Sequence, residues 1–489
     1  MREPDAQGVK SFIPDLLYAG GRFLPGRALV CDAGGRVASV ARAEELPGGG
    51  ERVRLAGRAL LPGMVNAHSH AFQRVIRGRT EYRGARSSDS FWTWREMMYA
   101  AAARLAPDDV YDASRMAFME MALGGITSVG EFHYLHRAPG GERYDDPNLL
   151  AKEVVRAARD VGIRIALLRV AYERAGHGKE PDARQLRFIE PDPDTFLRHA
   201  DALARDLDAE PHAWLGVAPH SVRAVTAGYL RAVNGFARGA GLSLHMHVSE
   251  QPAEVEACLA EHGRTPVALL ADEGVLGPHF TGVHAVHVTP REVAQLAASG
   301  ACVCACPTTE RNLGDGVVPA DALFGAGVGV ALGTDSHAQI DLLEDARELE
   351  YHLRLTSLRR NVLAPGGVDD EALAEGRHEN APAEAGGMSA LAARLFECAT
   401  VSGARSIGAP AGSFETGSAA DFFTVALDDP SVAGAGAEDL LPAVVFSLTR
   451  AAVRETAVGG RLVTQAGRHP AQEDIVSRFA ALQRRLWGK

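Results

Sequence analysis

The sequence predicts an α/β fold, namely a (β/α)₈ barrel of the TIM type with a small flanking β-sandwich domain built from both chain ends. Two observations carry this prediction. Between residues 61 and 410, short apolar runs alternate with Ala-, Leu- and Arg-rich stretches of helical spacing, and strands that alternate with helices form parallel sheets. Residues 1–60 and 411–489 instead hold Val- and Gly-rich segments with turn signals, which predict one composite β-domain with a C-terminal helix.

Eight apolar runs are candidate strands, as a closed barrel requires. In chain order they are residues 59–70, 125–134, 164–172, 213–221, 242–250, 280–288, 301–309 and 328–336. The stretches between them, such as 108–123 and 229–241, have the apolar spacing of helices. Nearly every run has His, Glu, Thr or Asp at its C-terminal end, which is the face where barrel enzymes place their active sites.

Composition narrows the classes of function. With 46% apolar and 23% charged residues, the chain has an ordinary globular composition. The formal net charge of −11 gives no electrostatic reason to bind nucleic acid or an anionic membrane, so a small molecule is the expected partner. Six cysteines are too few for a disulfide framework, and neither a secretion signal nor an apolar run of membrane-spanning length is evident. We therefore expect a cytoplasmic protein.

Two histidines, His68 and His70, end the first run and project from one face of the strand because residues i and i+2 share a face. This pair alone could equally be two hydrogen-bonded polar side chains at a strand end that bind no metal. Three further strand ends carry comparable groups. They are His245, His247 and Glu250 on the fifth run, His284 and His287 on the sixth, and Asp335 on the eighth. Converging imidazole and carboxylate groups suit Zn²⁺ or a similar divalent ion.

These strand-end residues resemble the amidohydrolase superfamily, in its deaminase branch with one metal ion. The resemblance implies metal ligands at His68, His70, His247 and Asp335. Because the branch places Glu three residues after its strand-five ligand, Glu250 selects His247 and not His245. Members with two metals usually have a strand-four lysine, which "WLGVAPHSVRAV" lacks. One divalent ion is therefore expected, and we expect Zn²⁺, although such ligands also accept Fe²⁺, Mn²⁺ or Co²⁺.

Further segments resemble the formimidoylglutamate deiminases of histidine breakdown. They are "NAHSHAFQR", "DSFWTWREMMY", "EFHYLH", "PHSVRAV" and "CPTTERNLGDG". The resemblance implies hydrolysis of N-formimidoyl-L-glutamate to N-formyl-L-glutamate and ammonia. It also implies a substrate pocket lined by Gln73, Arg95, Tyr134, His220 and Arg223.

The arginines after the metal histidines favour a dicarboxylate substrate, because the planar guanidinium pairs with carboxylate in bidentate fashion. Residues 74–95 hold six arginines against only Glu81 and Asp89. The six are Arg74, Arg77, Arg79, Arg83, Arg86 and Arg95. We expect most of them on a solvated loop, whereas the tryptophans around Arg95 in "SFWTWRE" indicate an ordered position.

A mechanism follows from metal chemistry. A bound Zn²⁺ would lower the pKa of water toward ~7 and supply hydroxide to the formimidoyl carbon. Asp335 is expected to accept the proton and return it to the departing nitrogen, Glu250 to hold the amidine, and His284 to stabilise the attacked centre. The division of proton transfer between Asp335 and Glu250 stays open.

Alternatives remain at this stage. A deaminase of a purine or an adenosine derivative would share the metal ligands but predicts an apolar pocket, and an inactive relative would serve as a structural or interaction protein. Acceptance of a formimino-aspartate substrate and formation of a homodimer are also open. Cys302, Cys304 and Cys306 are expected to be small buried residues and His287 to be structural, whereas His133, His245 and His337 are left undecided.

Overall fold

The computed structural model describes residues 8–46, 48–83, 89–179, 183–366 and 389–488. Its larger part is a barrel of parallel strands in sequence order. They are β6 (Met64–Ser69), β7 (Ile126–His133), β8 (Arg164–Ala171), β9 (Ala213–Pro219), β10 (Leu244–Val248), β11 (Phe280–His284), β12 (Cys302–Ala305) and β13 (Gly329–Leu332). A parallel bridge between Ser69 and Asp335 joins the first strand to the segment after the last. The predicted (β/α)₈ barrel is confirmed.

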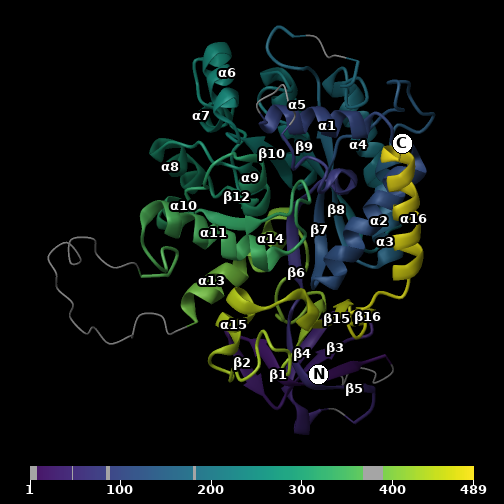
Figure 1. Ribbon diagram of the computed structural model, residues 1–489, viewed down its shortest axis with the longest axis vertical. Helices are drawn as coiled ribbons and strands as arrows, with labels where there is room; N and C mark the ends of the chain where they lie inside the picture. Colours follow the sequence, from purple (N-terminus) through teal and green to yellow (C-terminus); the bar gives the residue numbers. More distant parts are fainter. Residues whose placement is uncertain (1–7, 47, 84–88, 180–182, 367–388, 489) are drawn as a thin grey trace, which may run out of the picture.

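Helices surround these strands (Figure 1). They are α1 (Phe91–Ala102), α2 (Pro107–Leu123), α3 (Leu149–Val161), α4 (Pro193–Leu207), α5 (Ala227–Ala240), α6 (Pro252–His262), α7 (Pro266–Asp272), α8 (Pro290–Ser299), α9 (Pro307–Leu313), α10 (Ala320–Gly325), α11 (Leu342–Ser357), α13 (Ala390–Cys398), α14 (Val401–Ile407), α15 (Leu440–Ser447) and α16 (Gln472–Trp487). Several, such as α6 and α8, begin with proline and end at a left-handed glycine, the usual boundary residues of helices. Among the described residues, no helix is both long and apolar enough to cross a membrane.

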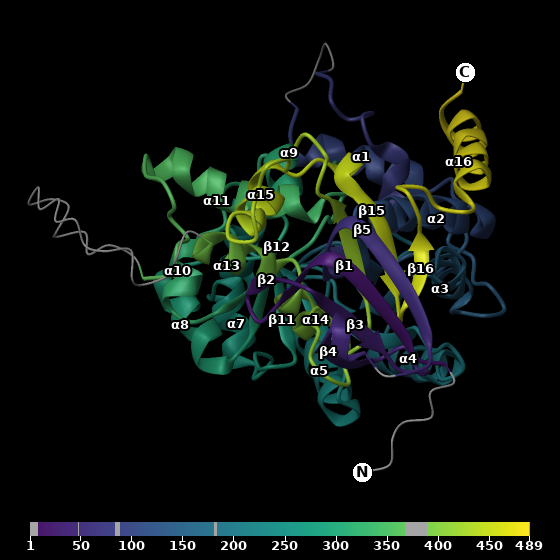
Figure 2. The same cartoon turned by 90° about the horizontal axis from the view of Figure 1, so that it is seen from below.

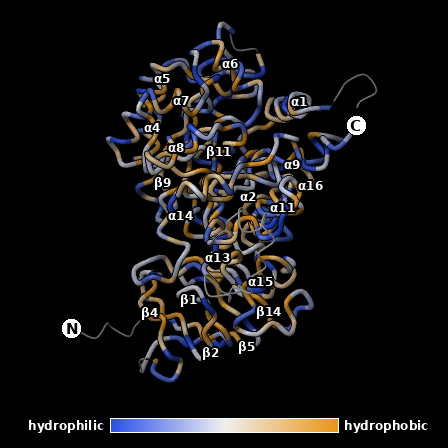
Figure 3. The backbone as a smooth tube through the Cα atoms, turned by 90° about the vertical axis from the view of Figure 1, so that its left-hand side faces the viewer, coloured by the Kyte–Doolittle hydropathy of each residue, from blue (hydrophilic) through white to orange (hydrophobic). Residues whose placement is uncertain are grey.

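The two chain ends form one mixed sheet at the opposite end of the molecule from helices α4 to α8 (Figure 3). Its strands are β1 (Lys10–Ala19), β2 (Arg22–Pro25), β3 (Arg27–Cys31), β4 (Val37–Arg42), β5 (Glu51–Pro62), β14 (Phe422–Ala426), β15 (Val453–Val458) and β16 (Arg461–Thr464). β5 pairs with β1 on one side and with β14 on the other, so all eight strands join one sheet (Figure 2). The predicted flanking β-structure from both chain ends is thus present, and its strands are joined in one mixed sheet.

The run 59–70, predicted as one strand, is two strands. Residues 59–62 belong to β5 in the mixed sheet, and β6 begins at Met64 in the barrel. Gly63 lies between them, where a Cβ atom would come within 2.3 Å of Thr127 Oγ1. The chain therefore passes directly from one sheet into the other through a position that only glycine fits. The predicted domain boundaries, after residues 60 and 410, stay predictions.

Buried and surface ion pairs join the chain ends to the barrel. Arg164 on β8 donates from Nε and Nη2 to both carboxylate oxygens of Asp421, at 2.8 and 3.1 Å. The last helix, α16, packs against α2 on the outside of the barrel (Figure 1). Its Arg478 donates to Asp112 at 2.7 Å, and its Asp474 accepts from Arg115 at 2.8 Å.

Candidate active site

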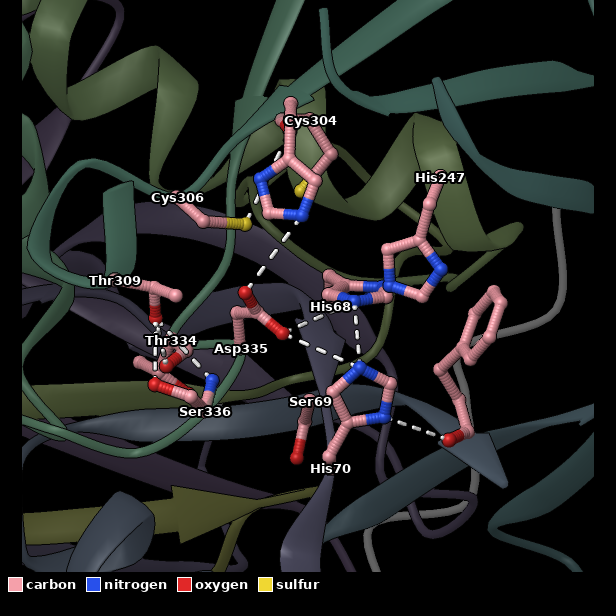
Figure 4. A network of polar contacts seen from close by, with 12 residues as sticks. His68, Ser69, His70, His247, Cys304, Cys306, Thr309, Thr334, Asp335 and Ser336 are labelled. Atoms are coloured by element: carbon pink, nitrogen blue, oxygen red, sulfur yellow. Dashed lines mark hydrogen bonds and ion pairs between the residues drawn. The ribbon is translucent and has the colours of Figure 1, made fainter. Parts of the chain in front are cut away.

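Four buried side chains converge at the C-terminal end of the barrel strands (Figure 4). His68 and His70 come from β6, His247 from β10, and Asp335 follows β13. One donor atom from each lies within 4.8 Å of the others. The Asp335 Oδ1 atom is 3.4 Å from His68 Nε2 and 3.2 Å from His70 Nε2. The structure thus brings together the four predicted metal ligands.

The hydrogen bonds of these imidazoles fit a divalent metal ion. His70 Nδ1 lies 2.9 Å from the Phe132 carbonyl oxygen and His247 Nδ1 lies 3.0 Å from that of His220. Because a carbonyl only accepts, each Nδ1 carries the proton, and each Nε2 presents its lone pair to the group. The Nε2 atoms of His68 and His70 are only 3.2 Å apart, which suits two donors to one cation. Burial lowers the pKa of His68 to about 3, so this imidazole is in the neutral form that binds metals.

The predicted catalytic residues lie beside the metal-binding group. His284 Nε2 is 3.7 Å from Glu250 Oε1 and 3.7 Å from Asp335 Oδ2. Burial raises the pKa of Glu250. Burial opposes ionisation of Asp335 as well, but the adjacent imidazoles of His68 and His70 hold its pKa well below the usual value. Two neighbouring carboxyl groups therefore differ in basicity, an arrangement found at acid–base sites.

Glu310 orients His284. Its Oε1 atom accepts from the Cys306 amide at 2.8 Å and lies 3.3 Å from His284 Nδ1. His284, Cys306 and Glu310 form a second group of possible metal donors. Since the Glu310 oxygen is already shared by an amide and an imidazole, we interpret this group as a hydrogen-bonded support that fixes the His284 ring.

One cavity connects the metal-binding group with the predicted substrate residues. Its lining includes all five of those residues: Gln73, Arg95, Tyr134, His220 and Arg223. Aromatic rings supply much of the remaining wall, from Phe91, Trp94, Tyr99, Tyr172 and Phe188. The Tyr134 hydroxyl accepts from Gln73 Nε2 at 2.9 Å, and Gln73 Oε1 is buried without a hydrogen-bond partner among the described residues. The cavity wall thus presents an unused acceptor.

Two cationic side chains face the same cavity. The Arg95 guanidinium lies 4.7 Å from the ring centroid of Trp92 and 5.3 Å from that of Tyr99. Its Nε and Nη1 atoms are buried and have no hydrogen-bond partner within the described part of the chain. Arg223 also lines the cavity. Burial lowers the pKa of its guanidinium, but nearby tyrosines and carboxylates raise it by more, so the net shift is upward. No salt bridge to either arginine is formed by the described residues, so both are available to an anionic ligand.

Two of the other arginines of the loop differ from expectation. Arg74 and Arg77 are not solvated, because both donate to the buried Glu120 of α2, each at 2.7 Å. Arg79 lies 5.3 Å from the Trp487 ring of α16. Arg83 is exposed as predicted, and Arg86 lies outside the described residues.

The other histidines and cysteines noted in the sequence are buried or hydrogen-bonded within the protein and do not line the cavity. His245 Nε2 lies 2.9 Å from the Ser406 carbonyl oxygen and His287 Nε2 lies 2.8 Å from that of Asp315. His133 is buried on β7 and lines no part of the cavity. His337 contacts Ser69 and Thr334 beneath the metal-binding group. Cys302, Cys304 and Cys306 are buried free thiols.

Sequence reasoning missed several residues around the cavity. Tyr99 lies one helical turn after Arg95, and Tyr172 directly follows β8, so both positions carried a usable signal. The hydroxyl of Tyr172 accepts from Gln185 at 3.1 Å. Gln185 and Phe188 come from an irregular segment between β8 and α4, where no periodicity could have indicated them.

Comparisons with known proteins agree with this geometry. The model of the Amidohydrolase family matches residues 59–463. The chain is 37% identical to formimidoylglutamate deiminase of Pseudomonas aeruginosa, over 88% of this chain and 89% of that protein. It is 30% identical to 5-methylthioadenosine/S-adenosylhomocysteine deaminase of Halobacterium salinarum, over 86% of this chain and 84% of that protein.

Solved structures share the fold. An amidohydrolase from Brucella melitensis superimposes with a TM-score of 0.85 at 31% identity, covering 98% of this chain and 99% of that one. An adenosine deaminase from Xanthomonas campestris with bound zinc gives a TM-score of 0.80 at 21% identity, covering 98% of each chain.

Proposed function

The chain belongs to the amidohydrolase family and carries its metal-binding group, and on that premise we propose that it is a formimidoylglutamate deiminase. The reaction is hydrolysis of N-formimidoyl-L-glutamate to N-formyl-L-glutamate and ammonia, a step in the degradation of histidine. The similarity to the Pseudomonas aeruginosa enzyme of that name, along most of both chains, supports this assignment.

The pair of arginines carries the proposal. Arg95 and Arg223 line the cavity that holds the metal-binding group, and no described carboxylate forms a salt bridge with either, although Glu250 and Glu254 raise the pKa of Arg223. A small substrate with two carboxylates would supply the missing partners, and bidentate pairing would fix its orientation. The reactive amidine at the other end of such a molecule would then lie near His247, Glu250 and Asp335, which line the same cavity.

We propose a single Zn²⁺ ion held by His68, His70, His247 and Asp335. Three imidazoles and a carboxylate are ligands that Zn²⁺ accepts readily. A divalent ion there would lower the pKa of water toward ~7 and so provide a hydroxide nucleophile at neutral pH.

Side chains of this protein would accept and donate the protons of the reaction. Asp335 accepts the two protons of the attacking water in turn and delivers both to the terminal amidine nitrogen, so that the C–N bond breaks, ammonia leaves and the formyl carbonyl remains. Glu250 holds the amidine N–H groups, and Gln73 Oε1 offers a second acceptor for them. His284, fixed through its Nδ1 by Glu310, stabilises the developing charge at the attacked carbon.

One observation favours a second candidate. The cavity wall contains five aromatic rings besides Tyr134, on which a purine could stack. One relative at 30% identity is a 5-methylthioadenosine/S-adenosylhomocysteine deaminase. Such a substrate has no pair of carboxylates for Arg95 and Arg223, so we rank this activity second.

Ammonia release separates the candidates. The purified protein with Zn²⁺ is offered N-formimidoyl-L-glutamate, adenosine, S-adenosylhomocysteine and guanine in parallel. Turnover of the dicarboxylate amidine is expected. Turnover of a nucleoside or base alone would replace the first proposal by the second, and no turnover with metal bound would indicate an inactive relative.

A further inference from the structure

A chain of buried polar groups runs beneath the metal-binding group. Asn66 Nδ2 donates to Thr334 Oγ1 at 2.7 Å, and the Thr334 hydroxyl lies 3.2 Å from His337 Nδ1. His337 Nε2 lies 3.1 Å from Ser69 Oγ, which donates to Glu131 Oε2 at 2.5 Å. Each group in this order donates to the next when His337 is neutral. The chain of donors therefore ends in one carboxylate, that of Glu131.

Glu131 holds the backbone on both sides of a metal ligand. Its Oε2 accepts from the side chain of Ser69 and its Oε1 accepts from the Ala71 amide at 2.7 Å. His70 lies between these two residues. The side chains of His68 and His70 face the metal-binding group, while the Ser69 oxygen points away from the gap between their rings (Figure 4). The residue between the two histidines is thus an attachment point for the strand.

Backbone hydrogen bonds and the side chain of His337 link strand β6 to the fourth proposed ligand, Asp335. The His70 amide donates to the Asp335 carbonyl at 3.1 Å, and the Asp335 amide donates to the His68 carbonyl at 3.1 Å. Asp335 and His337 both adopt positive φ angles, 42° and 59°, which cost energy for residues other than glycine. The contact from His337 to Ser69 ties this strained turn to β6.

Burying the carboxyl group of Glu131 lowers the free energy of unfolding, which is unfavourable for a residue with a structural role alone. It is buried, and no Lys or Arg among the described residues pairs with it. Burial raises the pKa of its carboxyl to about 7. A buried carboxyl with two hydrogen bonds and no cation is costly to fold, so a purely structural contact gives little reason for a carboxyl group here.

We propose that Glu131 and Ser69 are positioning residues for the metal centre: together with His337 they hold His70 and Asp335 in the arrangement that binds the ion. Neither touches the metal or the substrate. The inference rests on the metal-binding part of the proposed function and is independent of which substrate the enzyme hydrolyses.

Metal affinity measures this role directly. Zn²⁺ dissociation constants are determined by competition with a chelating dye for the unaltered protein, Ser69→Ala and Glu131→Gln. Loss of such outer contacts typically weakens metal binding by about 10- to 100-fold. We expect a weakening in this range for both variants, with the KM for substrate unchanged and kcat restored by excess Zn²⁺.

Glu350→Gln is a control for the loss of a buried carboxylate away from the metal centre. Glu350 lies on the outer helix α11 and accepts from the amides of Val362 and Leu363, at 3.0 and 2.9 Å, and from Arg354 Nε at 2.6 Å. It should lower thermal stability without changing Zn²⁺ affinity. Unchanged Zn²⁺ affinity in Ser69→Ala would overturn the proposal, as would a weakening no larger than that of Glu350→Gln. If Glu131→Gln does not fold, Ser69→Ala decides, since it removes both hydroxyl contacts and keeps the buried carboxyl.

Discussion

Replacement of Arg95 by Met examines the dicarboxylate pocket most closely. The Arg95 guanidinium stacks between Trp92 and Tyr99, and its Nε and Nη1 atoms are buried without partners in the described chain. Methionine keeps an unbranched apolar stem between the rings but removes both donors and the charge. The variant should therefore fold as the unaltered protein does and lose only the contact to substrate.

The size of the loss follows from the two free donors. A hydrogen bond to a charged partner contributes about 1.5–3 kcal/mol. Two such bonds at the lower limit give ~3 kcal/mol, which is roughly a 150-fold decrease in kcat/KM. Because the carboxylates stay distant from the reacting carbon, most of this decrease should appear as a higher KM.

Initial rates of ammonia release give the measurement. Arg79→Met is the control, since Arg79 also stacks on an aromatic ring, that of Trp487, but lies outside the cavity. The two monoamides of N-formimidoyl-L-glutamate identify the contact, because the Arg95→Met penalty should shrink for the one that lacks the carboxylate it binds. Unchanged kcat/KM, or an equal penalty for all three substrates, would refute the assignment of Arg95.

Four further perturbations follow from the structure. Asp335→Asn removes the proposed proton acceptor, so kcat at saturating Zn²⁺ should fall by ~1,000-fold or more; a residual activity above a tenth would contradict its role. Extraction of the metal with dipicolinate should abolish ammonia release and added Zn²⁺ should restore it, whereas turnover by protein shown by elemental analysis to be metal-free would argue against metal-dependent catalysis. Arg164→Met leaves Asp421 buried without its ion-pair partner, and urea unfolding should show a loss of ~3 kcal/mol; a loss within error would mean that this pair does not join the sheets. Gly63→Ala places a methyl group 2.3 Å from Thr127 Oγ1 and should cost ~2 kcal/mol in thermal unfolding, a cost that Thr127→Ala should reduce.

The barrel and the metal-binding group were predictable because they depend on local patterns. The alternation of strands with helices specifies a parallel sheet. Residues i and i+2 of one strand share a face, and parallel strands end at one edge, so the polar groups at the strand ends were expected to converge. The resemblance to the amidohydrolase superfamily then selected His68, His70, His247 and Asp335 among them. The aromatic and arginine residues of the cavity came partly from resemblance, and Tyr99 was missed although it lies one turn after Arg95.

The joining of the two chain ends in one β-domain was predicted, but the order in which their strands pair was not. The mixed sheet joins β5 to β14 across most of the chain length, and periodicity says nothing about which strands become neighbours. The division of residues 59–70 between two sheets was hidden because the apolar run continues through Gly63 to Val65 without a polar residue. The ion pairs of Arg74 and Arg77 with Glu120 form only when α2 packs beside the segment after β6.

The identity of the products tests the proposed reaction most directly. The metal-loaded protein is incubated with N-formimidoyl-L-glutamate, and the products are followed by proton NMR together with an ammonia assay. The account predicts N-formyl-L-glutamate and ammonia in equal amounts, since the bond to the terminal amidine nitrogen breaks. Formation of L-glutamate and formamide, from cleavage of the other C–N bond, or an unchanged substrate beside active turnover of S-adenosylhomocysteine, would contradict it.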